Sequence, residues 1–582
     1  MSVIQMLHIL ERRSSQRGSG LAAGPLLLLL GLLLLRCAGQ IPPSGGPTDT
    51  VPPTIIRTLP DSNAVGVRPE TIELEFSEYV DRNSVEESIF ISPSVGELEF
   101  DWSGPEVTVS FSEELREGIT YVLTVGTDVV DVRAGIRMAS AFSLAFSTGD
   151  SIDRGRVSGR VFDREPEGLM VFAYRLGARG GDSLDPTRLK PDYITQTGEG
   201  GAFTLQNIAF GIYRVFAIRD EYRNLLYDRG IDRYGVATFD PFVHAGAPHA
   251  GRVWFRITME DTTRPFLSSV RALDRHNLQL QFSESLDTVA FFRASVTVED
   301  TSAQEGLGVE VLTLDLRNRS RAGILLRQPL EADRGYRVVV RNVLDEAGNP
   351  LDTTNATLDI TGTDAPDTTR PFPLVVGIPD SSLGVPMEQI FELDFSEPVV
   401  RRSVTSALLL EDMDGVRQRV ELSWLNGRSL RMKPAEPLRE KTWYAIEVPL
   451  DSVVDFQGNS HTDSVFALRF ETLDLRTTGS VSGFVSDDSP RPERGPIYVS
   501  ASRLDESGGA PVTVKRDSVG PFQIDRLVEG HYSIEAFIDA DSSGSYTYGL
   551  PFPFSTSERF TVYDDSLRVR ARWPYEGVLL RF

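Results

Sequence analysis

Apolar and polar residues alternate strictly in three separate segments of the chain, and each segment ends in the triplet Phe-Ser-Glu. The segments cover residues 72–78, 278–284 and 391–397. An alternation with a period of two predicts a β-strand that has one face buried and the other face in water. We therefore expect the three segments to be equivalent strands of three related domains.

Further motifs recur around these strands in the same order. Each copy opens with Asp-Thr-x-x-Pro, at Asp49, Asp261 and Asp367. After the strand comes a leucine six positions before a tyrosine, and these tyrosines are Tyr121, Tyr336 and Tyr444. The spacing matches the tyrosine corner of immunoglobulin-like sandwiches, where the phenol hydrogen-bonds to upstream backbone. Internal repetition of this kind predicts one fold used three times.

Acidic residues recur within the copies at two further places. A glutamate closes each Phe-Ser-Glu strand, at Glu78, Glu284 and Glu397, and turns that end in Gly-Asn contain Asp345 and Asp455. A single active site cannot use residues that recur once in every domain. We therefore interpret the glutamates as structural residues at strand-to-loop junctions, and Asp345 and Asp455 as turn formers.

A second type of repeat occurs twice. Residues 201–230 match residues 520–549 without a gap, and Val157-Ser-Gly-Arg-Val matches Val481-Ser-Gly-Phe-Val. A gap-free match of this length indicates that the two segments share one fold. Thr, Val, Gly and Pro are spread throughout and no long amphipathic helical pattern occurs, which favours an all-β chain.

The first repeat resembles the bacterial Ig-like domain of the S-layer-protein type, and the second resembles the carboxypeptidase-regulatory-like, or transthyretin-like, β-sandwich. The resemblance implies an all-β fold, a tandem array of five β-sandwich domains. We expect Ig-like domains at 53–150, 261–363 and 367–474, and transthyretin-like domains at 154–259 and 478–582. Short linkers that contain proline favour a semi-rigid string, so we expect an elongated monomer with small interdomain interfaces.

The N-terminus shows a secretory pattern. A segment with three arginines precedes an apolar run from Leu26 to Leu35, and Cys37 follows. As a helix the run would be about 15 Å long, roughly half the thickness of a bilayer core, so a signal peptide fits better than a membrane span. The stretch resembles the lipobox of bacterial lipoproteins, which implies that residues 1–37 form a lipoprotein signal peptide and that Cys37 is the lipid-attachment site.

Two features qualify this interpretation. Arg36 stands where the lipobox usually has a small residue, and ordinary cleavage, for instance after Gly39, would give a soluble secreted protein.

The Pro- and Gly-rich residues 38–52 are expected to form a flexible tether, and their pattern is typical of lipoproteins of the Bacteroidota. The first acid after Cys37 is Asp49. Surface-export signals place acids closer to the cysteine, so we expect an outer-membrane lipoprotein that faces the periplasm.

Charge and composition exclude several classes of function. The chain has 83 acidic and 59 basic residues, a formal net charge of -24. Nothing would neutralise phosphates, so we expect no binding to nucleic acid. Cys37 is the only cysteine, so no intrachain disulfide can form. The six histidines have no zinc-binding spacing, and we expect no cofactor and no catalytic residues.

One loop is a weak calcium candidate. Asp539, Asp541 and Ser543 occupy positions 1, 3 and 5 of a calcium-loop pattern, with Gly544 at position 6. Position 12 is Leu550 instead of the required glutamate. A hairpin turn closed by Asx hydrogen bonds is the alternative interpretation.

We predict a non-catalytic, lipid-anchored envelope protein whose domains act as spacer and interaction modules for an unknown envelope protein or glycan. The alternative is a carbohydrate-binding accessory lipoprotein of a polysaccharide-uptake system, which would need a row of exposed aromatic residues. The tryptophans are scattered, at positions 102, 254, 424, 443 and 573, and we expect them in cores or at edges. An enzyme would need a concave pocket with convergent carboxylates.

Overall fold

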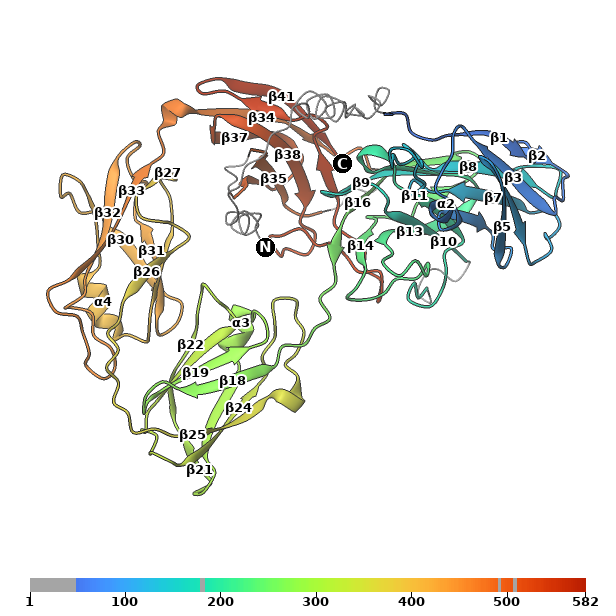
Figure 1. The fold of residues 1–582 in the computed structure, drawn as a ribbon. Helices are drawn as coiled ribbons and strands as arrows, with labels where there is room; N and C mark the ends of the chain where they lie inside the picture. The colour runs from blue at the N-terminus through green and yellow to red at the C-terminus, as the bar shows by residue number, and fades with distance from the viewer. Residues whose placement is uncertain (1–48, 178–183, 490–493, 506–509) are drawn as a thin grey trace, which may run out of the picture.

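The computed structural model describes residues 49–177, 184–489, 494–505 and 510–582 (Figure 1). Cys37, the predicted signal peptide and most of the predicted tether lie outside the described residues. The described residues form many separate sheets joined by loops and a few short helices, which confirms the predicted all-β fold. We number its five units sandwich 1 (49–148), sandwich 2 (155–259), sandwich 3 (261–361), sandwich 4 (367–472) and sandwich 5 (478–582).

Sandwich 1 contains the first copy of the Phe-Ser-Glu strand. Its elements are β1 (Ile55–Leu59), β2 (Ala64–Val65), β3 (Thr71–Phe76), α2 (Arg82–Glu86), β4 (Ile89–Ser92), β5 (Leu98–Ser103), β6 (Glu106–Phe111), β7 (Thr120–Val125) and β8 (Phe142–Ser147). The sheets β1-β3-β6-β5 and β2-β8-β7-β4 enclose one core. The alternation predicted for β3 is present, since Ile72, Leu74 and Phe76 are all buried.

Sandwich 3 has a similar arrangement. Its elements are β18 (Leu267–Ala272), β19 (Asn277–Phe282), α3 (Thr288–Phe291), β20 (Ser295–Asp300), β21 (Glu305–Leu307), β22 (Val309–Leu314), β23 (Arg321–Leu326), β24 (Gly335–Arg341), the 3-10 helix η3 (Thr353–Asn355) and β25 (Thr357–Thr361). The strand orders are β18-β19-β23-β22 and β21-β20-β24-β25.

Sandwich 4 repeats the order of sandwich 1. Its elements are β26 (Pro373–Val376), β27 (Ser382–Val385), β28 (Phe391–Phe395), α4 (Arg401–Ala407), β29 (Leu409–Asp412), β30 (Val420–Trp424), β31 (Ser429–Pro434), β32 (Trp443–Pro449) and β33 (Val465–Thr472). The strand orders are β26-β28-β31-β30 and β27-β33-β32-β29. The edge strand β27 pairs in parallel with β33, as β2 does with β8.

Sandwich 2 has a different topology. Its elements are β9 (Gly155–Phe162), β10 (Met170–Leu176), β11 (Tyr193–Gln196), the 3-10 helix η2 (Glu199–Gly201), β12 (Ala202–Ile208), β13 (Gly211–Arg219), β14 (Arg233–Val236), β15 (Phe242–Val243), β16 (His249–Arg256) and β17 (Thr258–Met259). The sheet β12-β9-β16 packs on the sheet β11-β10-β13-β14-β17, in which β15 also pairs with β13.

Sandwich 5 matches sandwich 2 strand for strand over most of its length. After the 3-10 helix η4 (Leu475–Thr477) come β34 (Thr478–Ser486), β35 (Ile497–Arg503), β36 (Val512–Arg516), β37 (Gly520–Val528), β38 (Gly530–Ile538), β39 (Phe560–Val562), β40 (Leu567–Val569) and β41 (Pro574–Arg581). The orders are β37-β34-β41 and β36-β35-β38-β39, with β40 paired to β38. The gap-free repeat in the sequence therefore corresponds to a repeat in topology.

The three corner tyrosines have the same hydrogen bond. Each hydroxyl accepts the backbone N–H of the residue five positions earlier, at 2.8 Å for Tyr121, 2.9 Å for Tyr336 and 3.0 Å for Tyr444. All three rings are buried. Sandwiches 2 and 5 each have a tyrosine corner that the sequence analysis does not identify. In these corners the hydroxyls of Tyr213 and Tyr532 donate to carbonyl oxygens four residues earlier, at 2.6 Å and 2.8 Å.

The five sandwiches follow a closed path, in which sandwich 5 returns to sandwich 2 (Figure 1). The hydroxyl of Tyr234 donates to the carbonyl of Gly549 at 3.0 Å, and Ser557 donates to the carbonyl of Val236 at 2.8 Å. The predicted elongated string is therefore wrong. The physical reason is that residues 550–560 of sandwich 5 pack aromatic and apolar side chains on the outer face of sandwich 2.

Sandwiches 1 and 2 also share a buried apolar cluster. Val122 and Ala145 of sandwich 1 belong to the same buried cluster as the core of sandwich 2. The Thr124 hydroxyl donates to the carbonyl of Ile194 at 3.1 Å. Shared apolar burial of this kind holds the two units together as a pair.

Candidate functional site

The structure brings together acidic residues that the sequence presents as three separate motifs. In sandwich 4, carboxylate oxygens of Asp367, Glu397 and Asp455 all lie within 4.8 Å of one another. Asp367 opens the Asp-Thr-x-x-Pro motif, Glu397 follows β28, and Asp455 lies in the turn between β32 and β33. We call these three residues the junction cluster, because they lie where sandwich 3 meets sandwich 4.

Local hydrogen bonds fix two of the three carboxylates. Oδ1 of Asp367 accepts the N–H of Thr369 at 2.9 Å, which is an Asx turn. Oδ1 of Asp455 accepts the N–H of Asn459 at 2.7 Å, and its Oδ2 accepts the side-chain amide of the same residue at 2.8 Å. That amide also donates to the carbonyl of Asp367 at 3.3 Å, so the opening motif and the turn are tied together.

No such local hydrogen bonds fix the carboxylate of Glu397. Its side chain is buried, with 9% of the residue exposed, and its Oε1 atom has no hydrogen-bond partner. Burial raises the pKa of Glu397 to about 8, with further contributions from the charges of Asp367, Asp455 and Asp274. A buried carboxylate without a partner is costly, so a proton or a cation would stabilise this group.

Sandwich 3 adds polar groups to the same place. The side-chain amide of Asn277 donates to Oδ2 of Asp367 at 2.9 Å and to Oδ2 of Asp274 at 2.8 Å. Both Asn277 and Asp274 are buried. The junction cluster therefore lies beside a fourth acidic group, which comes from the preceding sandwich.

The same three motifs also lie near one another in sandwiches 3 and 1, with more exposure. In sandwich 3 the oxygens of Asp261, Glu284 and Asp345 also lie within 4.8 Å of one another, but Asp261 is exposed and Glu284 only half-buried. In sandwich 1 burial, with the charges of Asp49 and Asp131, raises the pKa of Glu78. The glutamates do close strands and the aspartates do form turns. The sequence signal for the grouping was that three acidic positions recur together in every copy.

The weak calcium candidate has a different character. Asp539 and Asp541 lie with Glu558 in an acidic group of sandwich 5. Asp539 accepts the N–H groups of Ser543 and Gly544, at 3.0 Å and 3.1 Å. Glu558 accepts two backbone N–H groups, at 2.7 Å and 3.0 Å. Backbone donors thus satisfy these carboxylates, which is the arrangement of a turn closed by Asx hydrogen bonds.

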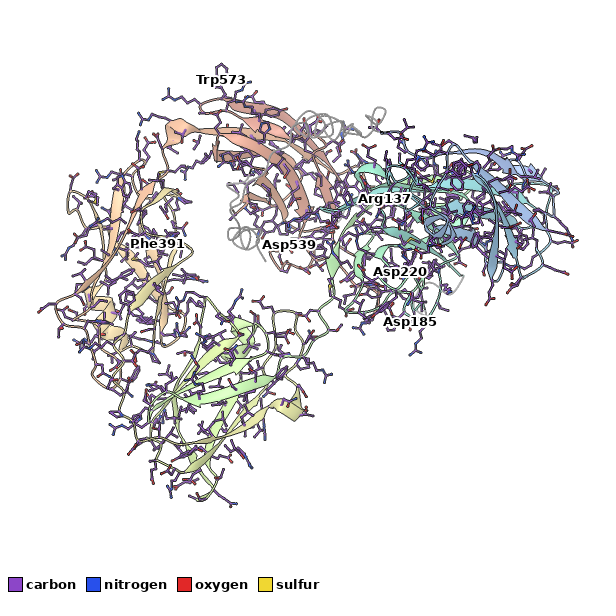
Figure 2. All side chains as sticks on the ribbon, viewed as in Figure 1. Arg137, Asp185, Asp220, Phe391, Asp539 and Trp573 are labelled. Carbon is purple, nitrogen blue, oxygen red and sulfur yellow. The ribbon has the colours of Figure 1, made fainter. Side chains whose placement is uncertain are left out.

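A hollow of about 900 Å³ lies between sandwiches 2 and 5. Aromatic side chains from both units line it: Phe239, Phe242, Trp254, Phe560 and Phe582. Of these, Phe239 and Phe242 are exposed. Trp573 lies elsewhere, at the outer edge of sandwich 5, where 71% of the residue is exposed (Figure 2).

Helices of the described part of the chain have few residues, and none of them has the length and apolar character that a membrane crossing requires. The predicted attachment residue Cys37 lies outside the described residues. Within sandwich 4, the ring of Phe391 is buried in the core (Figure 2).

Several solved structures are similar to parts of the chain. The N-terminal part of the bacterial S-layer protein SbsC has 16% identity over 36% of this chain and 44% of that chain, with a TM-score of 0.17. Domains 1–6 of SbsC have 9% identity over 89% and 67% of the two chains, with a TM-score of 0.17. L,D-transpeptidase 1 of Mycobacterium tuberculosis has 13% identity over 32% and 84%, with a TM-score of 0.15.

These likenesses are too weak to carry an argument about function, and the chain spans less than half of the first of these structures. The comparison with curated proteins found no match. A family described as a bacterial Ig-like domain matches residues 49–148 and 367–472. These residues form sandwiches 1 and 4, and each of these two sandwiches has an edge strand that pairs in parallel. Sandwich 3, of which every residue is described, has no such parallel strand. The chain therefore contains bacterial Ig-like domains in sandwiches 1 and 4.

Proposed function

We propose that this protein is a non-catalytic, lipid-anchored component of the cell envelope, whose sandwiches act as spacer and interaction modules. The observation that carries the proposal is the presence of bacterial Ig-like domains at residues 49–148 and 367–472 in a chain of tandem β-sandwiches. The apolar run that ends at Cys37 supports the anchor. The anchored protein would act as a monomer and meet an envelope protein or a glycan.

The proposal includes a finer identity for sandwiches 2 and 5, as transthyretin-like domains of a Bacteroidota-type lipoprotein. Their equivalent sheets, β12-β9-β16 and β37-β34-β41, support a common fold. The proposed location is the periplasmic side of the outer membrane. The distance between Cys37 and the first acid, Asp49, supports this side.

The cavity beside the junction cluster favours a non-catalytic role. Its volume is about 100 Å³, whereas pockets for small-molecule ligands have volumes of about 300–1,000 Å³. Convergent carboxylates are present there, but the space suits an ion and water better than a substrate. The clusters also recur in separate sandwiches, which fits a structural role.

Replacing Cys37 with serine should move the protein from the membrane fraction to the soluble fraction. The physical reason is that an acyl chain contributes about 0.8 kcal/mol per buried CH₂ group to membrane binding, and serine cannot carry the thioether-linked lipid. Fractionation of cells that express the wild type or C37S measures the change. Ser44→Ala, a substitution in the predicted tether, is the matched control. Retention of C37S in the membrane to the wild-type extent would contradict the anchor.

The alternative function, binding of carbohydrate, is favoured by the hollow between sandwiches 2 and 5. Exposed aromatic rings provide apolar faces for sugar rings, and Asp240, Arg252 and Arg559 line the same hollow with polar groups. This is the arrangement that a carbohydrate-binding accessory lipoprotein would need. The exposed Phe239 and Phe242 are the residues to test.

If the alternative holds, replacing Phe239 and Phe242 together with alanine should weaken binding to a soluble polysaccharide by about tenfold, because an aromatic contact contributes about 0.5–1.5 kcal/mol. Affinity electrophoresis in gels that contain defined polysaccharides measures the effect. Trp573→Ala is the control, since this exposed ring lies outside the hollow. Equal mobility of the wild type in all gels would leave the spacer role as the better account.

A further inference from the structure

The junction cluster holds more negative charge than its surroundings neutralise. Asp367, Glu397 and Asp455 lie together, and Asp274 of sandwich 3 adds its charge to theirs. The positive charge that acts on Glu397 comes from Arg428. The guanidinium of Arg428 already donates to the two oxygens of Asp394, at 2.9 Å and 2.6 Å.

The unpartnered Oε1 atom of Glu397 points to a ligand at this place. Buried polar atoms in folded proteins almost always have a hydrogen-bond partner, and an exception needs an explanation. This atom is buried and no donor from the described residues reaches it, and a carboxylate oxygen of Glu397 lies within 4.8 Å of carboxylate oxygens of Asp367 and Asp455. A bound cation would satisfy the free oxygen and neutralise the cluster at once.

We propose that Asp367, Glu397 and Asp455 bind a divalent cation of the calcium type at the junction of sandwiches 3 and 4. All the donors are carboxylate oxygens, which are the ligands of hard cations, and the cluster has no imidazole or thiolate that would favour zinc. Calcium accepts a variable number of oxygen ligands in flexible geometry, whereas magnesium demands a regular octahedron. The small cavity next to Glu397 leaves room for water ligands.

The position of the ligands suggests what the ion does. Asp367 belongs to the linker between β25 and β26, and Asn277 of sandwich 3 holds its Oδ2 atom. Glu397 and Asp455 belong to the body of sandwich 4. A cation bound to all three would fix the linker on sandwich 4 while it contacts sandwich 3. The inference is independent of the lipid anchor and of any glycan ligand.

The first experiment measures calcium binding to the chain that begins at residue 38, after treatment with a chelator. Calorimetric titration with CaCl₂ should detect binding, and Glu397→Gln should weaken it by about tenfold or more, because the charge of the ligands sets calcium affinity. Titration with MgCl₂ tests the selectivity. Glu421→Gln, an exposed acid on β30 of the same sandwich, should bind calcium as the wild type does. Glu284→Gln separates this site from the more exposed cluster in sandwich 3.

The second experiment distinguishes an ion site from a buried, protonated glutamate. Hydrogen exchange of residues 362–371 should slow when calcium is added to the wild type, and should not respond to calcium in E397Q. In calcium-free buffer above pH 8, where the Glu397 carboxyl is ionised, the same segment should exchange more slowly in E397Q than in the wild type, because the substitution removes a buried charge. The substitution is isosteric, so an unfolded variant is recognised by loss of protection throughout sandwich 4.

Three results would overturn the proposal. Absence of calcium binding by the wild type would mean that a proton, not a cation, satisfies Glu397. Binding that E397Q leaves unchanged but that E284Q abolishes would place the ion in sandwich 3. If calcium does not change the hydrogen exchange of residues 362–371 in the wild type, any calcium that binds must bind elsewhere and does not act on this junction.

Discussion

Replacing Asp394 with alanine should destabilise sandwich 4 by about 3–5 kcal/mol, because removal of one partner leaves a buried charge without compensation. Asp394 lies on β28 and its side chain has no exposed surface. It accepts both hydrogen bonds of the Arg428 guanidinium and one from the hydroxyl of Ser429, at 2.6 Å. The side chain of Arg428 is itself only 11% exposed, so water cannot replace the lost carboxylate.

Hydrogen exchange of the amides in β28 and β31 measures this loss, since a chain of five sandwiches does not unfold in one step. Glu392→Ala is the matched control. Glu392 lies two positions earlier on the same strand and pairs with the exposed Arg431, so its loss should cost at most about 1 kcal/mol. Asp394→Ala combined with Arg428→Ala should cost less than the two single changes added together. Additive costs, or exchange unchanged in D394A, would contradict a coupled buried pair.

Asp394 also shows where the sequence pattern stops being informative. The alternation in residues 391–397 predicts the strand and its buried phenylalanines correctly, but it places Asp394 on the face in water. In the structure, Arg428 lies over that face, and Arg317 of sandwich 3 lies 3.8 Å from Asp394. The period of two reports the inner face of one sandwich. It cannot report that a neighbouring sandwich covers the outer face.

The acidic clusters illustrate a second limit. Each acid has a sufficient local explanation, as an Asx turn or as the end of a strand, so no single motif indicates the grouping. The fold joins Asp367 to Asp455 across a separation that no local pattern spans. The tyrosine corners, in contrast, involve residues five positions apart, and their hydrogen bonds could be predicted from spacing alone. Local chemistry was predictable where both partners lie close together in the sequence.

Replacing Arg256 and Phe554 together with alanine should separate sandwich 5 from sandwich 2 and convert the closed path into an open string. Arg256 pairs with Glu535 at 2.6 Å, and its guanidinium lies over the rings of Tyr546 and Phe560. Phe554 packs against Phe216 and lies under a second guanidinium, that of Arg214. Arginine and aromatic residues at the centre of an interface commonly dominate its energy.

The closed form is favoured because sandwiches 3 and 4 keep the two surfaces near each other, which gives an effective concentration on the order of millimolar. A central arginine or aromatic residue contributes about 2 kcal/mol or more to an interface. The double substitution should therefore cost about 4 kcal/mol. Because about 1.4 kcal/mol corresponds to a factor of ten, the ratio of closed to open molecules should fall by about three orders of magnitude. A change of that size is enough to make the open form the major one.

Small-angle scattering of the chain that begins at residue 38 measures the outcome. Five sandwiches, each about 30–40 Å long, give an open string with a maximum dimension on the order of 150–200 Å, well above that of the closed path. Arg337→Ala is the control, because Arg337 forms an exposed ion pair with Asp359 inside sandwich 3 and should leave the dimension unchanged. If the double variant scatters as the wild type does, contacts other than those of Arg256 and Phe554 hold the path closed. If the wild type is already extended in solution, the contact between sandwiches 2 and 5 is too weak to close the molecule, and the sequence-based expectation of a string would describe the free protein.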